Sequence, residues 1–495
     1  MSRILQALAL HAGQSAREVA VCGDKTSLSW RELEEESCRL ADLFGNVSRL
    51  GLFMENSPAW IVADIAALRR RITCVPVPGF FSNSQKRHVL DDAGLDAVIS
   101  DDPCLVDTLG EGWCSRRLSV AGYPLVFAWR PGDSAPLLPG TIKITYTSGT
   151  TGTPRGVRLG LDAIEKVAES LCQRSAASTG DRALALLPLA ILLENIGSVY
   201  VPVLAGASML VPSSASLGLR GSGSVDVQVL GDCLRRLKPS ALILPPQLLK
   251  LLMGLAASGQ LPDSFRFLAV GGAMLPSGQI ETARVLGLPV FQGYGLSEMA
   301  SVVAMNAPSA NCTASVGKVL PHGELRISAE GEILVRGTLF QGYLHQDDWN
   351  PEDWLPTGDL GYMDEEGFLH VMGRRKNLII SAYGRNVSPE WPEAELLAEP
   401  ALAQVAVFGD SRPWLCAVLV PTPGMNGQAI RVAVDRVNTR LPDYARVLDY
   451  VIAEEPFSLA NELATANGRP RRETIHHRYR HQLDALYQGE HDCVL

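Results

Sequence analysis

The chain has 495 residues, a formal net charge of −9, a hydrophobic content of 46% and a charged content of 20%. This length exceeds one ordinary hydrophobic core and predicts two or three domains. The composition is typical of a globular protein, and the negative charge disfavours nonspecific binding to nucleic acid or to an anionic membrane surface.

The first segment, MSRILQALALHAG at residues 1–13, has a short apolar run after Arg3. We expect an amphipathic first helix rather than a signal peptide, because the run is short and charged sequence follows it. No stretch reaches 18 uninterrupted apolar residues, so the sequence predicts no transmembrane segment and leaves peripheral membrane contact open.

Strand and helix patterns alternate through the first 300 residues, which predicts an α/β fold with parallel sheets flanked by helices. Ligands of such sheets bind at the carboxyl ends of the strands. The predicted strands are residues 74–79, 96–100, 142–148, 240–246 and 265–272, and the clearest helices are 30–44 and 232–238.

The pattern changes near residue 313, where short strands joined by glycine turns predict an antiparallel, barrel-like β subdomain over about 313–373. A second change near Gly373–Lys376 precedes a smaller α+β segment, whose clearest strands are QVAVFGD and LCAVLVP. We therefore expect one domain over residues 1–373 and another over 377–495. The ten cysteines occur singly, which favours free thiols in a reducing compartment, and we expect a cytoplasmic protein.

The segment YTSGTTGTPRG at 146–156 follows a predicted strand and is dense in glycine and hydroxyl residues. Its backbone N–H groups and hydroxyls suit anionic oxygens, and its glycines permit close approach, so we predict a phosphate-binding loop. The loop lacks the Gly-Lys-Ser/Thr ending of a Walker A motif. Its candidate ligand residues are Thr147, Ser148, Gly149, Thr150, Thr151, Gly152 and Arg155.

This loop resembles the signature Tyr-Thr-Ser-Gly-Thr-Thr-Gly-x-Pro-Lys-Gly of the adenylate-forming superfamily, which includes acyl-CoA synthetases, luciferases and nonribosomal adenylation domains. Arg155 stands where lysine is usual and keeps a cation near the β- and γ-phosphates of ATP. The resemblance implies an AMP-forming acid–thiol ligase that uses ATP and Mg²⁺, with a large N-terminal domain and a small mobile C-terminal domain.

Two further segments match the superfamily in order. In QGYGLSE (292–298) the resemblance assigns Tyr294 to stacking on adenine, Ser297 to the α-phosphate and Glu298 to Mg²⁺, for which a carboxylate is a suitable ligand. The segment VGGAML (270–275) resembles the lining of the adenine and acyl pockets. The other nucleotide-binding candidates in these segments are Gly271, Gly272, Ala273, Gln292, Gly293 and Gly295.

The segment LPTGDLGYMDEEGFLHVMGRRKNLI (355–379) is the densest match. The resemblance implies that Asp359 accepts hydrogen bonds from both ribose hydroxyls, as a carboxylate can, and that Arg374 also contacts the ribose. It further implies a hinge over residues 374–376, with Lys376 as the hinge residue, about which the C-terminal domain (377–495) moves.

Residues 377–390 and 186–207 resemble the long-chain fatty acyl-CoA synthetase branch, with Ile191 in place of a histidine near the acyl entrance. An apolar residue there favours a hydrophobic carboxylic acid, such as a fatty acid, as the substrate. The acceptor implied is the thiol of CoA, with the phosphopantetheine of an acyl carrier protein or an amine left open. The sequence does not define an oligomeric state.

The segment LATANGRPRRE (463–473) resembles the superfamily's Asn-Gly-Lys-x-x-Arg, but Arg469 occupies the position of the catalytic lysine. No lysine follows Lys376. The superfamily's lysine places positive charge between the substrate carboxylate and the phosphate. Three interpretations remain open. The first is an active ligase in which Arg469 does this work. The second is an enzyme of the same fold that mainly runs the transfer step, or that passes its acyl group to a carrier protein or an amine. The third is a non-catalytic or catalytically weakened acyl- or nucleotide-binding relative, or one that needs a partner subunit.

Overall fold

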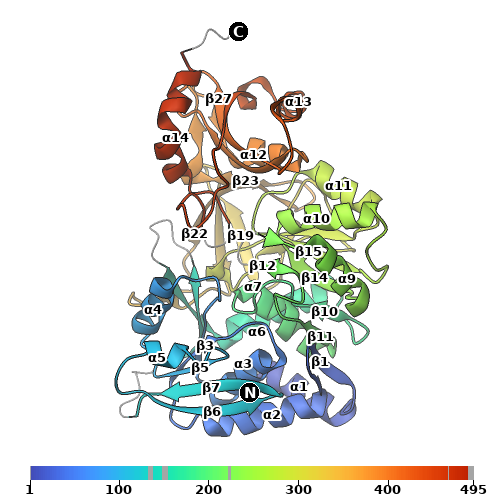
Figure 1. The fold of residues 1–495 in the computed structure, drawn as a ribbon, viewed down its shortest axis with the longest axis vertical. Helices are drawn as coiled ribbons and strands as arrows, with labels where there is room; N and C mark the ends of the chain where they lie inside the picture. Colours follow the sequence, from blue (N-terminus) through green and yellow to red (C-terminus); the bar gives the residue numbers. More distant parts are fainter. Residues whose placement is uncertain (1, 132–137, 148–153, 221–223, 466–467, 489–495) are drawn as a thin grey trace.

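The computed structural model describes residues 2–131, 138–147, 154–220, 224–465 and 468–488. Figure 1 shows an elongated molecule in which the C-terminal elements are stacked at one end and the N-terminal elements lie at the other. Across these ranges, no helix combines the length and the apolarity needed to cross a membrane.

An eight-stranded sheet forms around the predicted strands at 74–79, 96–100 and 142–148. Its four central strands are parallel and its edges antiparallel, in the order β21-β9-β8-β4-β3-β5-β7-β6. The strands are β3 (Arg49–Phe53), β4 (Thr73–Pro76), β5 (Ala97–Ser100), β6 (Cys114–Val120), β7 (Tyr123–Trp129), β8 (Thr141–Thr147), β9 (Arg155–Gly160) and β21 (Gly342–Tyr343).

A nine-stranded sheet has the order β18-β17-β16-β15-β14-β10-β11-β1-β2 and is parallel from β16 to β1. The strand predicted at 240–246 stops at Leu244, because Pro246 occupies the first position of a helix and has no N–H to give to a sheet. The strands are β1 (Val19–Gly23), β2 (Ser27–Ser29), β10 (Arg182–Leu184), β11 (Ser208–Val211), β14 (Ala241–Leu244), β15 (Phe267–Val270), β16 (Val290–Tyr294), β17 (Ala304–Met305) and β18 (Lys318–Val319).

Several of the helices that cover these sheets begin at polar caps. Ser29 and Glu32 form a reciprocal capping box at the start of α2, and Asp226 caps α9, which therefore begins earlier than the predicted residue 232. The predicted N-terminal helix is α1, capped by Ser2. The helices are α1 (Arg3–Gln14), α2 (Trp30–Leu43), α3 (Pro58–Arg70), α4 (Asn83–Asp92), α5 (Leu105–Thr108), α6 (Leu161–Ser175), α7 (Leu192–Asn195), α8 (Val201–Ala205), α9 (Val227–Leu237), α10 (Pro246–Ala257) and α11 (Ser277–Val285), and a π-helix, Ile196–Tyr200, lies between α7 and α8.

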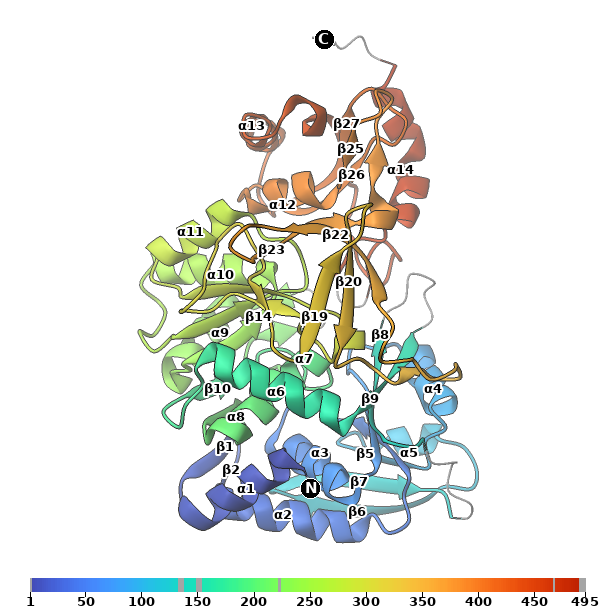
Figure 2. The same ribbon diagram turned by 180° about the vertical axis from the view of Figure 1, so that it is seen from behind.

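The predicted antiparallel region is a four-stranded sheet in the order β19-β20-β22-β23, seen at the centre of Figure 2. Its strands are β19 (Gly323–Ile327), β20 (Glu332–Gly337), β22 (Leu355–Met363) and β23 (Leu369–Arg374). Residues 342–343, which fall within the same stretch of sequence, instead form β21 and pair with β9 of the eight-stranded sheet.

After a 3₁₀ turn at Arg375–Asn377, the last part of the chain folds around a three-stranded sheet, β26-β27-β28. Alternate residues of β26 and β27 face opposite sides, as the strand period requires, so one apolar cluster packs with α12 and α13 and another with α14. The elements are β24 (Ile379–Ile380), β25 (Asn386–Val387), α12 (Glu390–Ala398), β26 (Leu402–Phe408), β27 (Leu415–Pro421), α13 (Gly427–Asn438), β28 (Val447–Ile452) and α14 (Arg472–Leu486); a separate hairpin pairs β12 (Leu219–Arg220) with β13 (Ser224–Val225). The predicted α/β class, with a large N-terminal part and a smaller α+β C-terminal part, is confirmed.

Candidate active site

The predicted phosphate loop joins two paired strands. β8 ends at Thr147 and β9 begins at Arg155, and these two residues are partners in the antiparallel register. The predicted ligands Ser148, Gly149, Thr150, Thr151 and Gly152 lie outside the described residues.

A buried polar cluster surrounds Lys143, in the middle of β8. Lys143 Nζ donates to Asp64 Oδ1 at 2.8 Å and to Tyr200 Oη at 2.9 Å, and it also contacts Asn195 Oδ1. Both Lys143 and Asp64 are almost fully buried, and such a charge is tolerated only when it is paired and hydrogen-bonded. The signal for this cluster in the sequence is a lysine in the middle of a strand of β-branched and aromatic residues, and Lys143 was not among the predicted site residues.

Arg155 and Glu298 are brought together by Tyr343. The Arg155 guanidinium lies 3.8 Å from the centre of the Tyr343 ring, and Tyr343 Oη donates to Glu298 Oε1 at 2.6 Å. Burial and the adjacent Glu298 carboxylate raise the pKa of Tyr343, so the phenol stays a donor. Tyr343 was not among the predicted site residues, because its only sequence signal is its position at the end of a β region.

The two glycine-containing segments follow neighbouring parallel strands. Val270 at the end of β15 pairs with Gln292 in β16, so Gly271 and the residues after it lie beside Gly293. A Cβ on Gly271 would lie 3.2 Å from the Gly293 carbonyl oxygen, which explains the need for glycine. Ala273 follows in the same segment, and Gly295 leads into the 3₁₀ turn Ser297–Met299, which holds Ser297 and Glu298.

Asp359 lies at the meeting point of three segments that are distant in sequence. Its Oδ2 accepts from Tyr294 Oη at 2.6 Å, and its Oδ1 is 2.8 Å from Arg374 Nε, the cross-strand partner in β23. Burial raises the pKa of Asp359, and Arg374, Tyr294 and Arg469 oppose that shift. Burial thus favours the protonated carboxyl group, and the neighbouring donors favour the carboxylate.

Arg469 reaches this cluster from the C-terminal part of the chain. Its Nη2 donates to the Gly272 carbonyl oxygen at 2.6 Å. The pKa of Arg469 is lowered by the surrounding protein and by Arg374, with Asp359 acting in the opposite direction. The side chain is nevertheless open to solvent, as expected at the mouth of a cleft, and arginine stays cationic at physiological pH.

Hydrogen bonds between Thr465 and Arg469 hold the two ends of the Arg469 loop together. Thr465 and Arg469 exchange two hydrogen bonds, with Thr465 N donating to Arg469 O at 2.8 Å and Arg469 N donating to Thr465 Oγ1 at 3.1 Å. Gly468, at φ +75°, provides the left-handed conformation that closes the turn.

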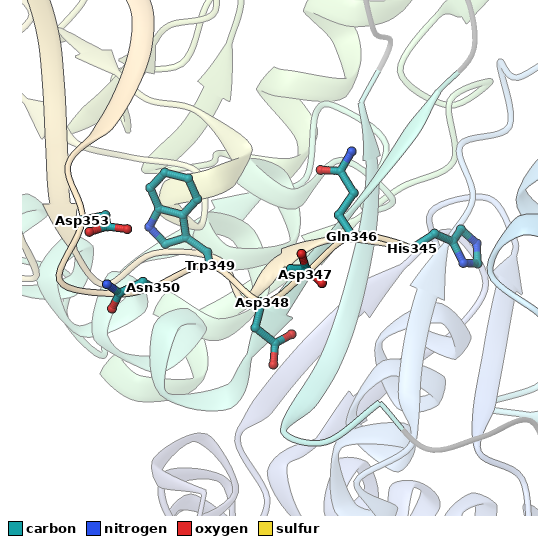
Figure 3. Close-up of a pocket in the computed structure, with 7 residues that line it drawn as sticks. All are labelled: His345, Gln346, Asp347, Asp348, Trp349, Asn350 and Asp353. Carbon is teal, nitrogen blue, oxygen red and sulfur yellow. The ribbon is translucent and has the colours of Figure 1, made fainter.

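A hollow of about 440 Å³ is lined by Gly358, Arg374, Arg375 and Lys376, beside Asp359 and at the predicted hinge. A larger hollow, of about 810 Å³, lies along residues 345–353 and contains none of the predicted site residues. Its side chains come from one stretch and point in different directions (Figure 3). Of the two hollows, the smaller one is therefore the one that includes predicted site residues.

Cys312, Asp364 and His370 lie close enough to suggest a metal site, with donor atoms within 4.8 Å of one another. However, His370 already bonds the Ala314 carbonyl through Nδ1 and Asp364 Oδ2 through Nε2. Asp364 Oδ1 accepts from backbone amides of its own turn. These groups are satisfied by the protein, and the cluster is best described as a local brace of the β22–β23 hairpin.

Glu194, in the segment that resembles the fatty acyl-CoA synthetase branch, is completely buried. Its Oε1 accepts from Ser198 Oγ at 2.7 Å, and its Oε2 makes no hydrogen bond of good geometry within the described chain. Burial raises the pKa of Glu194 to about 8, although the nearby amides of Leu187 and Leu186 favour the ionised form.

We expect Glu194→Gln to flatten the pH dependence of stability. The folded pKa of Glu194 is above its ordinary value of 4.5, so the unfolded chain ionises first and wild-type stability falls as the pH rises from about 4.5 to 8. The loss is up to about 1.4 kcal/mol per pH unit in this window. In thermal unfolding from pH 5.5 to 8.5, the stability of the variant relative to that of the wild type should increase as the pH rises. A pH-independent difference, or the same trend in a surface Glu111→Gln control, would contradict this.

Two protein-family models match this chain. The model of the AMP-binding enzyme family matches residues 8–344, and the model of the AMP-binding enzyme C-terminal domain matches residues 376–491. A 2-succinylbenzoate–CoA ligase from Bacillus velezensis is 29% identical over 80% of this chain and 82% of its own length. A long-chain-fatty-acid–CoA ligase from Mycobacterium bovis is 29% identical over 76% of this chain and 73% of its own length.

Solved structures share the fold. The anthranilate CoA ligase AuaEII, in complex with anthranoyl-AMP, has a TM-score of 0.80 at 19% identity and covers 98% of both chains. The Bacillus subtilis O-succinylbenzoate CoA synthetase, in complex with ATP and magnesium ion, has a TM-score of 0.73 at 22% identity and covers 94% of this chain and 98% of its own. At these identities the likeness establishes the architecture only. Taken with the two family matches, which span most of the sequence, it leads to one conclusion: this chain is a member of the AMP-binding enzyme family.

Proposed function

We propose that the protein is an AMP-forming acid–thiol ligase that activates a hydrophobic carboxylic acid with ATP and then transfers the acyl group to CoA. The observation that carries this proposal is the convergence on Asp359 of Tyr294, Arg374 and Arg469 from three separate segments. A nearly buried carboxylate surrounded by cations and a phenol suits a polar, anionic ligand such as a nucleotide.

In the first half-reaction an oxygen of the substrate carboxylate attacks the α-phosphorus of ATP, and the bond to pyrophosphate breaks. Asp359 would accept hydrogen bonds from the ribose hydroxyls, with Arg374 and Tyr294 orienting its carboxylate. Arg155 would face the β- and γ-phosphates from the end of the phosphate loop. Arg469 would contribute positive charge where the carboxylate and the α-phosphate oxygens meet.

Glu298 is the proposed Mg²⁺ ligand. Its carboxylate is a hard oxygen donor, and the hydrogen bond from Tyr343 to Oε1 fixes its orientation, so the residue fits the ion. Mg²⁺, when bound, offsets the charge of the phosphates. Tyr343 would also hold Arg155 near the same phosphates, and Ser297 precedes Glu298 at the α-phosphate position.

In the second half-reaction the CoA thiol attacks the acyl carbon of the adenylate and AMP leaves. We propose that residues 377–495 move about a hinge at 374–376, with Lys376 at its centre, between the two half-reactions. Arg469 would then leave the site, so its identity would affect the first half-reaction and not the second.

Two classes of carboxylic acid are candidates for the substrate. The apolar Ile191, half-buried at the start of α7, and the fatty-acid ligase among the relatives support a fatty acid. The relatives named 2-succinylbenzoate–CoA ligase support an aromatic carboxylate as the second candidate. A carrier-protein thiol or an amine is the alternative acceptor.

The test is a pyrophosphate-release screen over aliphatic fatty acids, 2-succinylbenzoate and simple aromatic acids, with and without CoA. AMP and an acyl-CoA are the expected products with one acid class. Pyrophosphate release without CoA consumption would favour another acceptor. A thermal shift with ATP but no turnover across the panel would contradict the ligase and indicate a binding protein.

A further inference from the structure

Lys250 bonds the large N-terminal part of the chain to the C-terminal part, in addition to the hydrogen bond from Arg469 to Gly272. Lys250, in α10, donates from Nζ to the carbonyl oxygens of Glu399 at 2.7 Å, Leu397 at 3.1 Å and Leu402 at 3.2 Å. These carbonyls belong to the last turn of α12, to its C-cap Glu399 and to the first residue of β26. Figure 1 shows α12 above α10 and α11 and to their left.

The contact uses the full donor capacity of the ammonium group. The last carbonyls of a helix have no partner within the helix and carry its negative dipole end, so a cation is favoured there. Lys250 relies on these carbonyls, because the Glu399 carboxylate is already engaged by Arg436 at 3.1 Å and Arg440 at 3.3 Å. Burial lowers the pKa of Lys250, with Glu399 opposing this.

The position of α12 is linked to the position of Arg469 through Arg472. Arg472, at the start of α14 and three residues after Arg469, donates to Glu393 Oε2 of α12 and to the Val407 carbonyl of β26, both at 3.0 Å. Glu393 also accepts from Val407 N at 2.7 Å. The Arg469 loop, α12 and β26 are thereby connected as one body, and holding α12 on α10 holds Arg469 against Gly272.

We propose that Lys250 is a positioning residue that latches the C-terminal domain in the arrangement where Arg469 faces the nucleotide site. This inference rests on the proposed two-step ligase reaction. The latch supports acyl-adenylate formation and has to open before the thiol step, because the three carbonyls move away with α12. Lys250 itself touches no reacting atom.

The test compares the two half-reactions in Lys250→Met. We expect ATP–pyrophosphate exchange to fall about tenfold, equivalent to about 1.4 kcal/mol. Thioester formation from a supplied acyl-adenylate and CoA should stay the same or rise. Lys238→Met, at an exposed lysine that ends the neighbouring helix α9, is the matched control and should change neither rate. Lys250→Gln, which keeps an amide donor, should fall between the wild type and Lys250→Met.

A second readout does not depend on catalysis. The hinge contains three tryptic sites, Arg374, Arg375 and Lys376, and we expect trypsin to cut there severalfold faster in Lys250→Met than in the wild type or Lys238→Met. Equal hinge cleavage in all three proteins, or an equal loss in both half-reactions, would overturn the latch. A different outcome would separate the two proposals. If none of the tested acids supported pyrophosphate exchange in the wild type, while hinge cleavage differed between the variants as expected, the proposed function would fail and the latch would stand.

Discussion

Replacing Arg469 with alanine is expected to slow acyl-adenylate formation by about 10²–10³-fold, the usual cost of removing a group that stabilises developing negative charge. The guanidinium lies beside the Asp359–Arg374 pair and is anchored by Nη2 on the Gly272 carbonyl, so its remaining N–H groups are held near the proposed nucleotide site. ATP–pyrophosphate exchange with the preferred acid measures this step. Thioester formation from a supplied acyl-adenylate should be nearly unchanged.

Arg469→Lys tests whether the site needs the donor geometry of arginine or only a positive charge. Arginine has a fork of donors, and here one arm is used on Gly272, whereas lysine would offer a single nitrogen for both the carbonyl and the substrate. We therefore expect an exchange rate between those of the wild type and Arg469→Ala. Arg471→Ala, two residues away on the same loop, is the matched control. An alanine variant as active as the wild type would show that Arg469 does not take part.

Short motifs were the part of the site that the sequence could predict. Each of them is a continuous stretch of sequence, the longest being residues 355–379, so local spacing carries the information. In the structure, Asp359 contacts Tyr294 and Arg374. Strands such as β4 and β5, which correspond to the predicted strands 74–79 and 96–100, were also predictable, because they are buried on both faces and are mostly apolar in the sequence.

Contacts between distant segments were not predictable in the same way. Tyr343 reaches Glu298 and Arg155 only because β21 pairs with β9, and Lys250 reaches α12 only through the packing of two separately folded parts. Neither residue belongs to a pattern of spacing. Likewise, the partners of Lys143 come from α3, α7 and the π-helix, more than 50 residues away. Such contacts depend on tertiary geometry, which local propensity does not encode.

The second large effect is expected for Asp359→Asn, which should weaken ATP binding by about 10- to 150-fold. This range corresponds to the loss of a hydrogen bond to a charged group, about 1.5–3 kcal/mol. An asparagine presents one acceptor oxygen in place of two, and its NH₂ group can only donate, so it cannot offer a separate acceptor oxygen to each ribose hydroxyl. It also removes the negative charge between Arg374 and Arg469. Calorimetric titration with ATP measures the affinity directly.

Folding should survive this change. Burial raises the pKa of Asp359, which means that the protein interior disfavours the carboxylate charge, and a neutral side chain of the same shape relieves that cost. We expect thermal unfolding without ATP to change little, while the stabilisation by ATP is lost. Tyr294→Phe, which removes the donor to Oδ2 but keeps the carboxylate, should weaken ATP less than Asp359→Asn. If Asp359→Asn bound ATP as tightly as the wild type, the ribose would have to bind elsewhere, and the convergence on Asp359 would be structural.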